Sequence, residues 1–178
     1  MAHVDHAVRR ATRGDAVMLH LVAAATFPLA APGTPQADVQ LFIDLNLRVD
    51  HFHAYLEDPE LRVFIAEVDG TPAGYAMLNV RTETDPQVVP MLSRTPSVEL
   101  SKFYLLAGRH GSGLADELMG AVLAEARKTD AGSIWLGVHD ANDRPNAFYD
   151  RHRFVRRGKK LFQVGTSIAV DLIRERIL

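Results

Sequence analysis

The fold is decided by the stretch Val98-Glu-Leu-Ser-Lys-Phe-Tyr-Leu-Leu-Ala-Gly-Arg-His-Gly-Ser-Gly-Leu-Ala-Asp-Glu-Leu-Met119, which joins a strand pattern to a helix pattern through a glycine-rich turn. Residues 98–106 are apolar and aromatic enough for a buried strand. From Leu114 to Lys128, apolar side chains recur at four-residue spacing and therefore share one face of a helix. A strand, a turn and a helix in this order point free backbone N–H groups and the positive helix end at one spot. The stretch therefore predicts an anion site that suits a pyrophosphate.

The turn Gly108-Arg-His-Gly-Ser-Gly113 fits neither of two familiar phosphate loops. A P-loop needs Lys and then Ser or Thr after its last glycine, whereas Leu114 and Ala115 follow Gly113. A dinucleotide fingerprint needs a third glycine, which the continuation to Asp116 lacks. A purely structural turn is the alternative, because glycine turns between strand and helix are common in α/β proteins.

Length and composition predict one globular domain over residues 1–178. The formal net charge of −2 argues against a nucleic-acid partner. The absence of cysteine excludes disulfides, thiol catalysis and cysteine-based metal sites. His51 and His53 lie two positions apart on an expected helix and point to different faces, so we expect no metal site there.

The pair Arg9-Arg10 precedes an apolar run over residues 16–31, an order also found in secretory signal peptides. Asp15 adjoins the run and His20 interrupts it, which argues against a signal. No apolar run approaches the roughly 20 residues that span a bilayer. We therefore expect a cytoplasmic protein without a membrane partner.

Two helices are expected before the first hairpin. Asp15 is a good N-cap for a helix to Phe27, which Pro28 would end. Thr34-Pro35 favours an N-cap followed by proline at the first helical position. The apolar stripe of this second helix runs without interruption to about Asp58.

The other elements follow from the same periodicities. Asp69-Gly70 between two apolar runs predicts a β-hairpin with a tight turn. Residues 81–97 hold several prolines and charges and predict a long loop, of a length that is often functional. The order β-α-α-β-β-β-α-β-α-β-β predicts an α/β fold, one mixed sheet with helices on both faces. The remaining strands are expected at 6–13, 63–68, 73–80, 133–138, 160–164 and 168–173, and a short helix at 142–151.

A second patterned segment reads Leu136-Gly-Val-His-Asp-Ala-Asn-Asp-Arg-Pro-Asn-Ala-Phe-Tyr-Asp-Arg-His-Arg-Phe154. It resembles the segment V-x-x-x-N-x-x-A-x-x-F-Y-x-x-x-G-F of the Gcn5-related N-acetyltransferase (GNAT) family. The glycine turn resembles the acetyl-CoA loop of the same family, Gln/Arg-x-x-Gly-x-Gly/Ala. His110 departs from this pattern at Gln or Arg, Pro145 at alanine and Arg153 at glycine. The matched positions are Gly113, Ala115, Val138, Asn142, Phe148, Tyr149 and Phe154.

The resemblance covers residues 6–173 and implies a single acetyltransferase domain. The family fold is a mixed, mostly antiparallel sheet of about seven strands, splayed in the middle, with helices on both faces. The implied activity is direct transfer of an acetyl group from acetyl-CoA to a primary amine of a small molecule or a protein terminus, in a ternary complex and without a metal. The alternative is a CoA-binding or regulatory domain that has kept the fold and lost catalysis. A homodimer is a family habit and a common arrangement.

The resemblance also implies where acetyl-CoA would bind. Backbone N–H groups of the loop would hold the pyrophosphate, because glycine lets an anion approach the main chain closely. Pantetheine would lie in the gap of the splayed sheet and pair with the strand before the loop. Asn142 and Phe148 complete the expected cofactor site, although Asn142 is also a good helix cap. The loop residues are His110, Gly111, Ser112, Gly113, Leu114 and Ala115, and the strand residues are Tyr104, Leu105 and Leu106.

Two residues are candidates for proton transfer. Tyr149 is the candidate general acid for the leaving sulfur of CoA, and the alternative is a buried packing residue. Glu99, at the start of the central strand, is the candidate general base for the amine, and the alternative is a charged residue at a strand end. Water chains often deprotonate the amine in this family, so no single base is assured. His139, Asp140 and His152 are further alternatives, each expected to be a solvated surface group.

The acceptor pocket is expected around Phe27, Asn46 and the loop at residues 81–97, where the family builds it. A backbone N–H beside the thioester would stabilise the negative charge on its oxygen and leave no side-chain signature. The identity of the acceptor amine stays open, because these segments are the least patterned of the chain.

Overall fold

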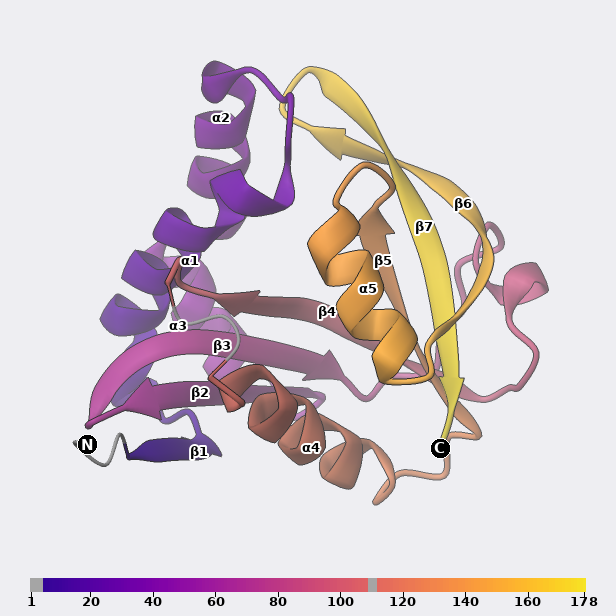
Figure 1. Ribbon diagram of the computed structural model, residues 1–178, viewed down its shortest axis with the longest axis horizontal. Helices are drawn as coiled ribbons and strands as arrows, with labels where there is room; N and C mark the ends of the chain where they lie inside the picture. Colours follow the sequence, from indigo (N-terminus) through magenta and orange to yellow (C-terminus); the bar gives the residue numbers. More distant parts are fainter. Residues whose placement is uncertain (1–4, 109–111) are drawn as a thin grey trace.

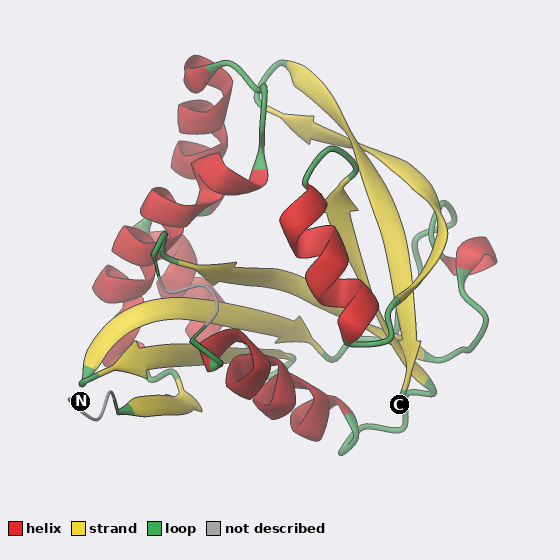
Figure 2. Cartoon of the chain, viewed as in Figure 1, coloured by secondary structure: helices red, strands yellow, loops and turns green. Residues whose placement is uncertain are grey.

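In the computed structural model, residues 5–108 and 112–178 are described, and they form one seven-stranded sheet with helices packed on it (Figures 1 and 2). A short 3-10 turn at Val89–Met91 lies in the long loop between the third and fourth strands. The strands are β1 (His6–Arg10), β2 (Leu61–Val68), β3 (Thr71–Asn79), β4 (Ser97–Leu105), β5 (Ser133–His139), β6 (Val155–Val164) and β7 (Ser167–Ile177). The α-helices are α1 (Ala16–Ala30), α2 (Gln36–Asn46), α3 (Val49–Glu57), α4 (Leu114–Ala126) and α5 (Asp143–Arg151).

The strand order is β1-β2-β3-β4-β5-β7-β6, and every neighbouring pair is antiparallel except β4 with β5. The parallel pair is short: it runs from Ser97 opposite Ser133 to Glu99 opposite Trp135. Beyond that point β4 and β5 diverge, which splits the sheet in the middle (Figure 1). The mixed, mostly antiparallel and splayed sheet is therefore confirmed.

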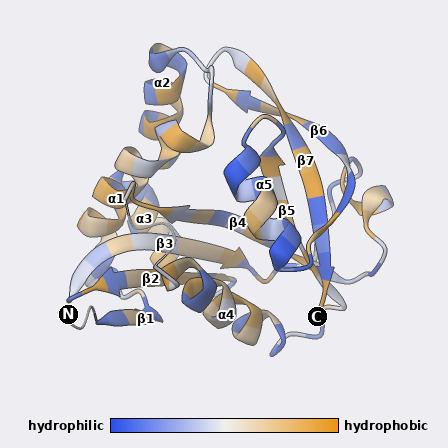
Figure 3. Cartoon of the chain, in the orientation of Figure 1, coloured by the Kyte–Doolittle hydropathy of each residue, from blue (hydrophilic) through white to orange (hydrophobic). Residues whose placement is uncertain are grey.

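Helices cover both faces of the sheet, as predicted. On one face, α4 and α5 contribute Leu118, Val122 and Tyr149 to a core with the middle strands. On the other face, α1, α2 and α3 build a second core that contains Leu19 and Phe52. The edge strand β6 is hydrophilic along much of its length (Figure 3). No helix in the described part of the chain is long and apolar enough to cross a membrane.

The hairpin of β2 and β3 turns at Asp69-Gly70, as predicted. Both residues have positive φ, 49° for Asp69 and 74° for Gly70. This is the backbone of the tight turns whose twist matches that of the flanking strands. The hairpin carries the sheet from β2 to β3 and so places β4, the strand that enters the glycine turn, at the centre.

The single helix expected over residues 35–58 is instead two helices, α2 and α3. Leu47 (φ −126°) and Arg48 (ψ 167°) leave the helical conformation between them. The Leu47 carbonyl oxygen lies 2.8 Å from Nδ1 of His20 on α1, which provides a hydrogen-bond partner at the break. Because the apolar stripe continues across the break, periodicity alone predicts one helix.

Proline and cap positions also differ from expectation. Pro28 lies inside α1, which continues to Ala30. Because proline has no N–H, the hydrogen bond from residue 28 to the Ala24 carbonyl is missing. The helix tolerates this loss in its last turn, close to its end at Ala30. The N-cap residue of α2 is Pro35 rather than Thr34. β6 and β7 both extend beyond their predicted ranges, and β1 is shorter than its own.

Candidate active site in the split sheet

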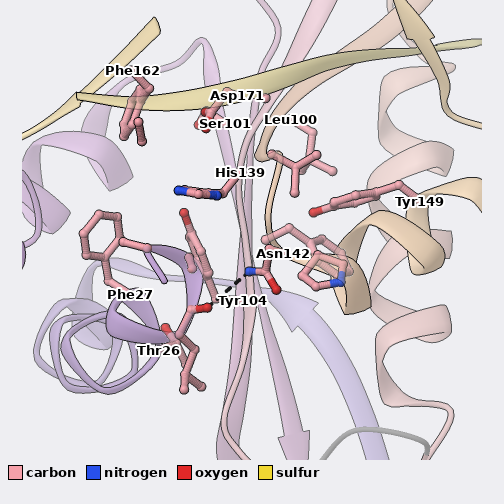
Figure 4. A pocket seen from close by; sticks show the side chains of 18 of the residues that line it. Thr26, Phe27, Leu100, Ser101, Tyr104, His139, Asn142, Tyr149, Phe162 and Asp171 are labelled. Carbon is pink, nitrogen blue, oxygen red and sulfur yellow. Dashed lines mark hydrogen bonds between the residues drawn. The ribbon is translucent and has the colours of Figure 1, made fainter. Parts of the chain in front are cut away.

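A cavity of about 530 Å³ lies where β4 and β5 separate (Figure 4). Its walls come from the end of α1, the diverging parts of β4 and β5, the start of α5 and the β6–β7 hairpin. Leu105 and Tyr149 line it from the core under α4 and α5, and Phe27 and Tyr104 line it from the core under α1–α3. The cavity therefore connects the two faces of the sheet through the split.

The edge of β4 that faces the split has no strand partner after Glu99 among the described strands. Its peptide groups are therefore available to a ligand that hydrogen-bonds like a strand. Tyr104 and Leu105 line the cavity, as the expected pantetheine site requires. The Leu106 N–H is already donated to the Ala73 carbonyl at 2.8 Å, so this residue can offer only its carbonyl.

A β-bulge interrupts the alternation of side chains along β4. Met77 of β3 pairs with Lys102, and Leu78 pairs with Leu100, so Ser101 is an extra residue on β4. The Ser101 hydroxyl donates to the Met77 carbonyl at 3.3 Å. Because the bulge shifts the alternation, Glu99 and Tyr104 lie on the same face of β4 although five positions separate them. Both line the cavity.

Tyr149 is held at the cavity wall by aromatic neighbours. Its ring centroid lies 6.3 Å from that of Phe103 and 5.7 Å from that of Phe154, both in edge-on contacts. The hydroxyl points into the cavity (Figure 4) and makes no hydrogen bond to a residue that the structure describes. Burial raises the pKa of this phenol above its usual range, and Tyr104 adds to the effect. The phenol is therefore protonated at neutral pH and can donate.

Asn142 and Phe148 hold different positions around α5. Asn142 is the N-cap residue by position, but its side chain makes no cap hydrogen bond. Its Nδ2 donates instead to the Leu29 carbonyl at 3.2 Å, which ties the start of α5 to the end of α1 (Figure 4). Phe148 stacks on Phe103 with 5.5 Å between centroids and lies outside the cavity lining.

Glu99 lines the cavity from the last residue of β4 that pairs with β5. Burial raises the pKa of its carboxyl, and the neighbouring Glu83 adds to the increase. Lys102 and Lys160 act in the opposite direction. A carboxylate with a raised pKa is a better proton acceptor than an exposed one, which suits the expected base.

Two further titratable groups line the cavity from β5 and β7. His139 was expected on the surface, but its side chain is only 15% exposed and faces the cavity. Its Nδ1 accepts the Ala141 N–H at 3.1 Å, so the neutral ring carries its proton on Nε2. Asp171 was not predicted at all, although a carboxylate within the apolar stretch 168–173 is a signal that could have revealed it.

The other two alternatives lie outside the cavity lining. His152 Nε2 lies 2.8 Å from Oδ1 of Asp116, and the ring packs 4.4 Å from that of Phe148. Asp140 forms an ion pair of 3.4 Å with Lys159. Both residues therefore have structural partners of their own.

The expected acceptor residues separate in the structure. Phe27 lines the cavity and stacks on Phe42 of α2, with 4.2 Å between centroids and 5° between planes. Asn46 lies outside the lining, and its side-chain amide donates to the Phe42 carbonyl at 2.9 Å. The loop at residues 81–97 reaches the site through Asp85, which forms an ion pair with the cavity residue Lys160.

The glycine turn leads into the first turn of α4. His110 and Gly111 lie outside the described residues. Gly113 has a φ of 89°, and a Cβ added to it would meet nothing within 4 Å, so this side of the backbone is open. The first intrahelical bond joins the Glu117 N–H to the Gly113 carbonyl, which leaves the N–H groups of Ala115 and Asp116 without an intrahelical partner. The Leu114 N–H points to Ser112 Oγ at 3.4 Å. An anion fits this arrangement.

Residues 7–154 match the family model described as the Acetyltransferase (GNAT) family. The chain belongs to the GNAT family of N-acetyltransferases. An uncharacterized N-acetyltransferase of Mycobacterium tuberculosis is 39% identical over 165 residues, which are 92% of this GNAT chain and 98% of the relative.

Solved structures show the same fold at low identity. The PaiA N-acetyltransferase of Thermoplasma acidophilum, solved in complex with coenzyme A, has a TM-score of 0.75 at 17% identity, with 98% of this chain and 99% of that chain covered. The yncA protein of Salmonella typhimurium, solved with acetyl-CoA, has a TM-score of 0.69 at 16% identity, with 98% and 94% covered. The GNAT fold is therefore shared beyond recognisable sequence identity.

Proposed function

We propose that this GNAT enzyme transfers the acetyl group of acetyl-CoA directly to a primary amine in a ternary complex. The main support for this proposal is the cavity through the split sheet, because a phenol, a carboxylate and an unpaired strand edge all line it. Acetyl-CoA would enter from the α4–α5 face and the amine from the α1–α2 face. The reacting groups would then meet between β4 and β5.

The phosphate end of acetyl-CoA would lie at the first turn of α4. The free N–H groups of Ala115 and Asp116, with the open backbone at Gly113 and the adjoining Ser112 and Leu114, support a pyrophosphate site. His110 and Gly111 complete the proposed loop by sequence. Coenzyme A and acetyl-CoA in the Thermoplasma and Salmonella proteins support the same co-substrate here.

The reaction needs one proton removed and one supplied. Glu99 would take the proton of the attacking amine, directly or through water, as the nitrogen bonds to the carbonyl carbon. A backbone N–H on the open edge of β4 would stabilise the negative charge on the carbonyl oxygen. When the C–S bond breaks, the Tyr149 hydroxyl would give its proton to the sulfur, which leaves as the CoA thiol.

Two departures from the family pattern are accommodated by the backbone. Arg153 adopts a φ of 63°, the left-handed conformation that glycine takes most readily, so the chain keeps the family geometry at that point. Pro145 lies in the first turn of α5, where a missing N–H breaks no intrahelical bond. Both findings favour an active enzyme over a fold that has lost catalysis.

The test is release of free CoA thiol from acetyl-CoA by the purified full-length protein, with and without a panel of primary amines. Amine-dependent thiol release together with an acetylated product would support the proposal. Acetyl-CoA binding without thiol release in the presence of any amine would refute it and would favour a regulatory CoA-binding domain.

A further inference from the structure

Aromatic rings form one wall of the cavity on the acceptor side. Phe27 of α1 and Phe162 of β6 line the cavity and face one another (Figure 4). Phe42 of α2 stacks on Phe27 and lies 5.7 Å from the Phe162 ring, so it fixes both. Phe162 nevertheless keeps 38% of its surface exposed. We call Phe27, Phe42 and Phe162 the aromatic wall. Such a surface binds an apolar or aromatic group best.

A carboxylate lies on the same side of the cavity. Asp171 of β7 is opposite His139 of β5 and Lys160 of β6 in the sheet register. A Cβ on Gly137 would lie 3.1 Å from Asp171 Oδ2, so the glycine makes room for this carboxylate beside the split. The Asp171 carboxylate has no hydrogen bond and no ion pair with any residue that the structure describes, and its cross-strand neighbour Lys160 is paired with Asp85. An ammonium group would supply the missing partner.

The remaining charges of the lining disfavour a polycation. Glu99 and Asp171 are its only carboxylates among the described residues, and Arg144 and Lys160 are cations. With Asp171 on one ammonium and Glu99 assigned to proton transfer, the described lining offers no third carboxylate, so a second ammonium would meet like charge or apolar rings. The lining suits one positive charge attached to an apolar body.

The β6–β7 hairpin, which lines the cavity through Val164 and Ala169, is fixed at its tip to α2. Asp38 of α2 accepts hydrogen bonds from the Thr166 N–H and hydroxyl at 2.8 Å each, and from the Ser167 hydroxyl. These contacts hold the tip of the β6–β7 hairpin against α2 (Figure 1). Gly165 permits the approach, because a Cβ there would lie 2.6 Å from the Asp38 Cα. A fixed hairpin beside the cavity leaves more room for a small molecule than for the end of a folded polypeptide.

From these observations we propose that the acceptor is a small primary amine joined by a short linker to an aromatic or apolar group, that is, an arylalkylamine. Asp171 binds its ammonium before transfer, Glu99 takes the proton that this nitrogen must lose in order to attack, and the aromatic wall binds its ring. The proposal rests on the proposed acetyl transfer and names the acceptor class of that same site. Asp171 and Phe162 are specificity-determining residues in this assignment.

The first experiment compares acceptors for the wild-type enzyme. Initial rates of thiol release are measured with 2-phenylethylamine, spermidine and a short peptide with a free N-terminus. We expect kcat/KM for 2-phenylethylamine to exceed both others by at least about tenfold. A preference for spermidine or the peptide would overturn the acceptor class and leave acetyl transfer standing. No turnover with any amine, despite acetyl-CoA binding, would refute the transfer and the acceptor class together.

The second experiment removes one ring of the aromatic wall. Phe162→Ala should raise KM for 2-phenylethylamine about tenfold and leave KM for propylamine, which has no ring, within about twofold. Leu161→Ala is the matched control, because Leu161 is the 65% exposed neighbour on β6 and does not line the cavity. An equal effect of Phe162→Ala on both amines would overturn the assignment of the wall to the ring.

The third experiment removes the carboxylate. Asp171→Asn should raise KM for both amines at least about tenfold while the Kd of acetyl-CoA stays within about twofold, and Asp171→Glu should recover part of the loss. Asp130→Asn is the matched control, since Asp130 is exposed and lies outside the lining. Unchanged KM values in Asp171→Asn would overturn the role of Asp171.

Discussion

Replacing Asp171 by Asn should make the protein more stable at neutral pH, although it should impair acceptor binding. Burial raises the pKa of Asp171 to about 6 from the ordinary value of 3.8. Asp140 adds to this increase, whereas His139 and Lys160 oppose it. This difference corresponds to about 3 kcal/mol in the free energy of unfolding. Because the side chain keeps some solvent contact, we expect about 1–2 kcal/mol.

The sign follows from proton uptake. Below pH 3.8 the carboxyl is protonated in both the folded and the unfolded chain, and it costs the fold nothing relative to Asn. Between pH 3.8 and about 6 the folded chain still binds this proton while the unfolded chain has released it, so the free energy of unfolding falls as the pH rises. Above about pH 6 the carboxylate is charged in both states, and the cost of burying that charge is fully present. Asn is neutral throughout, so its stabilising effect should be present at pH 7.5 and absent near pH 4.

Thermal unfolding of wild type and Asp171→Asn at several pH values checks this prediction. For a chain of this length, we expect the midpoint of the variant to lie about 2–8 °C higher at pH 7.5. Asp130→Asn, the control already introduced, should stay within about 0.5 kcal/mol of wild type. A variant that is less stable at pH 7.5, or equally stabilised at pH 4, would refute the reasoning and make Asp171 a structural residue.

Three predictions concern catalysis and the co-substrate. Tyr149→Phe should lower kcat at least about tenfold and leave the calorimetric Kd of acetyl-CoA nearly unchanged; equal turnover would remove Tyr149 from the mechanism. Gly113→Asp should abolish acetyl-CoA binding, because it adds a negative group and a Cβ at a φ of 89°; retained affinity would move the phosphate site elsewhere. Glu99→Gln should remove the acidic limb from the pH profile of kcat/KM. In the wild type this limb should lie above the pH range of an ordinary carboxyl group, because burial raises the pKa of Glu99. An unchanged profile in the variant would exclude Glu99 as the base.

The sequence predicts the parts of this molecule that depend on local pattern. The apolar alternation around Asp69-Gly70 and the four-residue spacing after Leu114 each produce the expected element, because neighbouring residues decide them. The break at Leu47 is stabilised by His20 of another helix, which contacts the Leu47 carbonyl, and locally by the Arg48 N–H, which donates to His51 Nδ1 at 3.2 Å. The bulge at Ser101 depends on pairing with β3, which no local pattern predicts.

The candidate site divides in the same way. Tyr149 follows from a motif within one segment, and the structure brings it to the cavity with Glu99. Asp171 becomes a cavity residue only when β7 inserts between β5 and β6, so its part in the site depends on the strand order. Asn46 shows the opposite outcome. It lies on the expected helix, but its side-chain amide donates to the Phe42 carbonyl and it does not line the cavity.

The short pairing of β4 with β5 has a consequence for the mechanics of the whole molecule. Hydrogen bonds of the sheet join the four strands β1–β4 to the three strands β5–β7 through only three residue pairs. A co-substrate that hydrogen-bonds along the open edge of β4 would act as an inserted strand and continue the ladder across the split. Amide hydrogens on that edge would then exchange rapidly in the free protein and slowly in the complex, and the two half-sheets would begin to open as one cooperative unit.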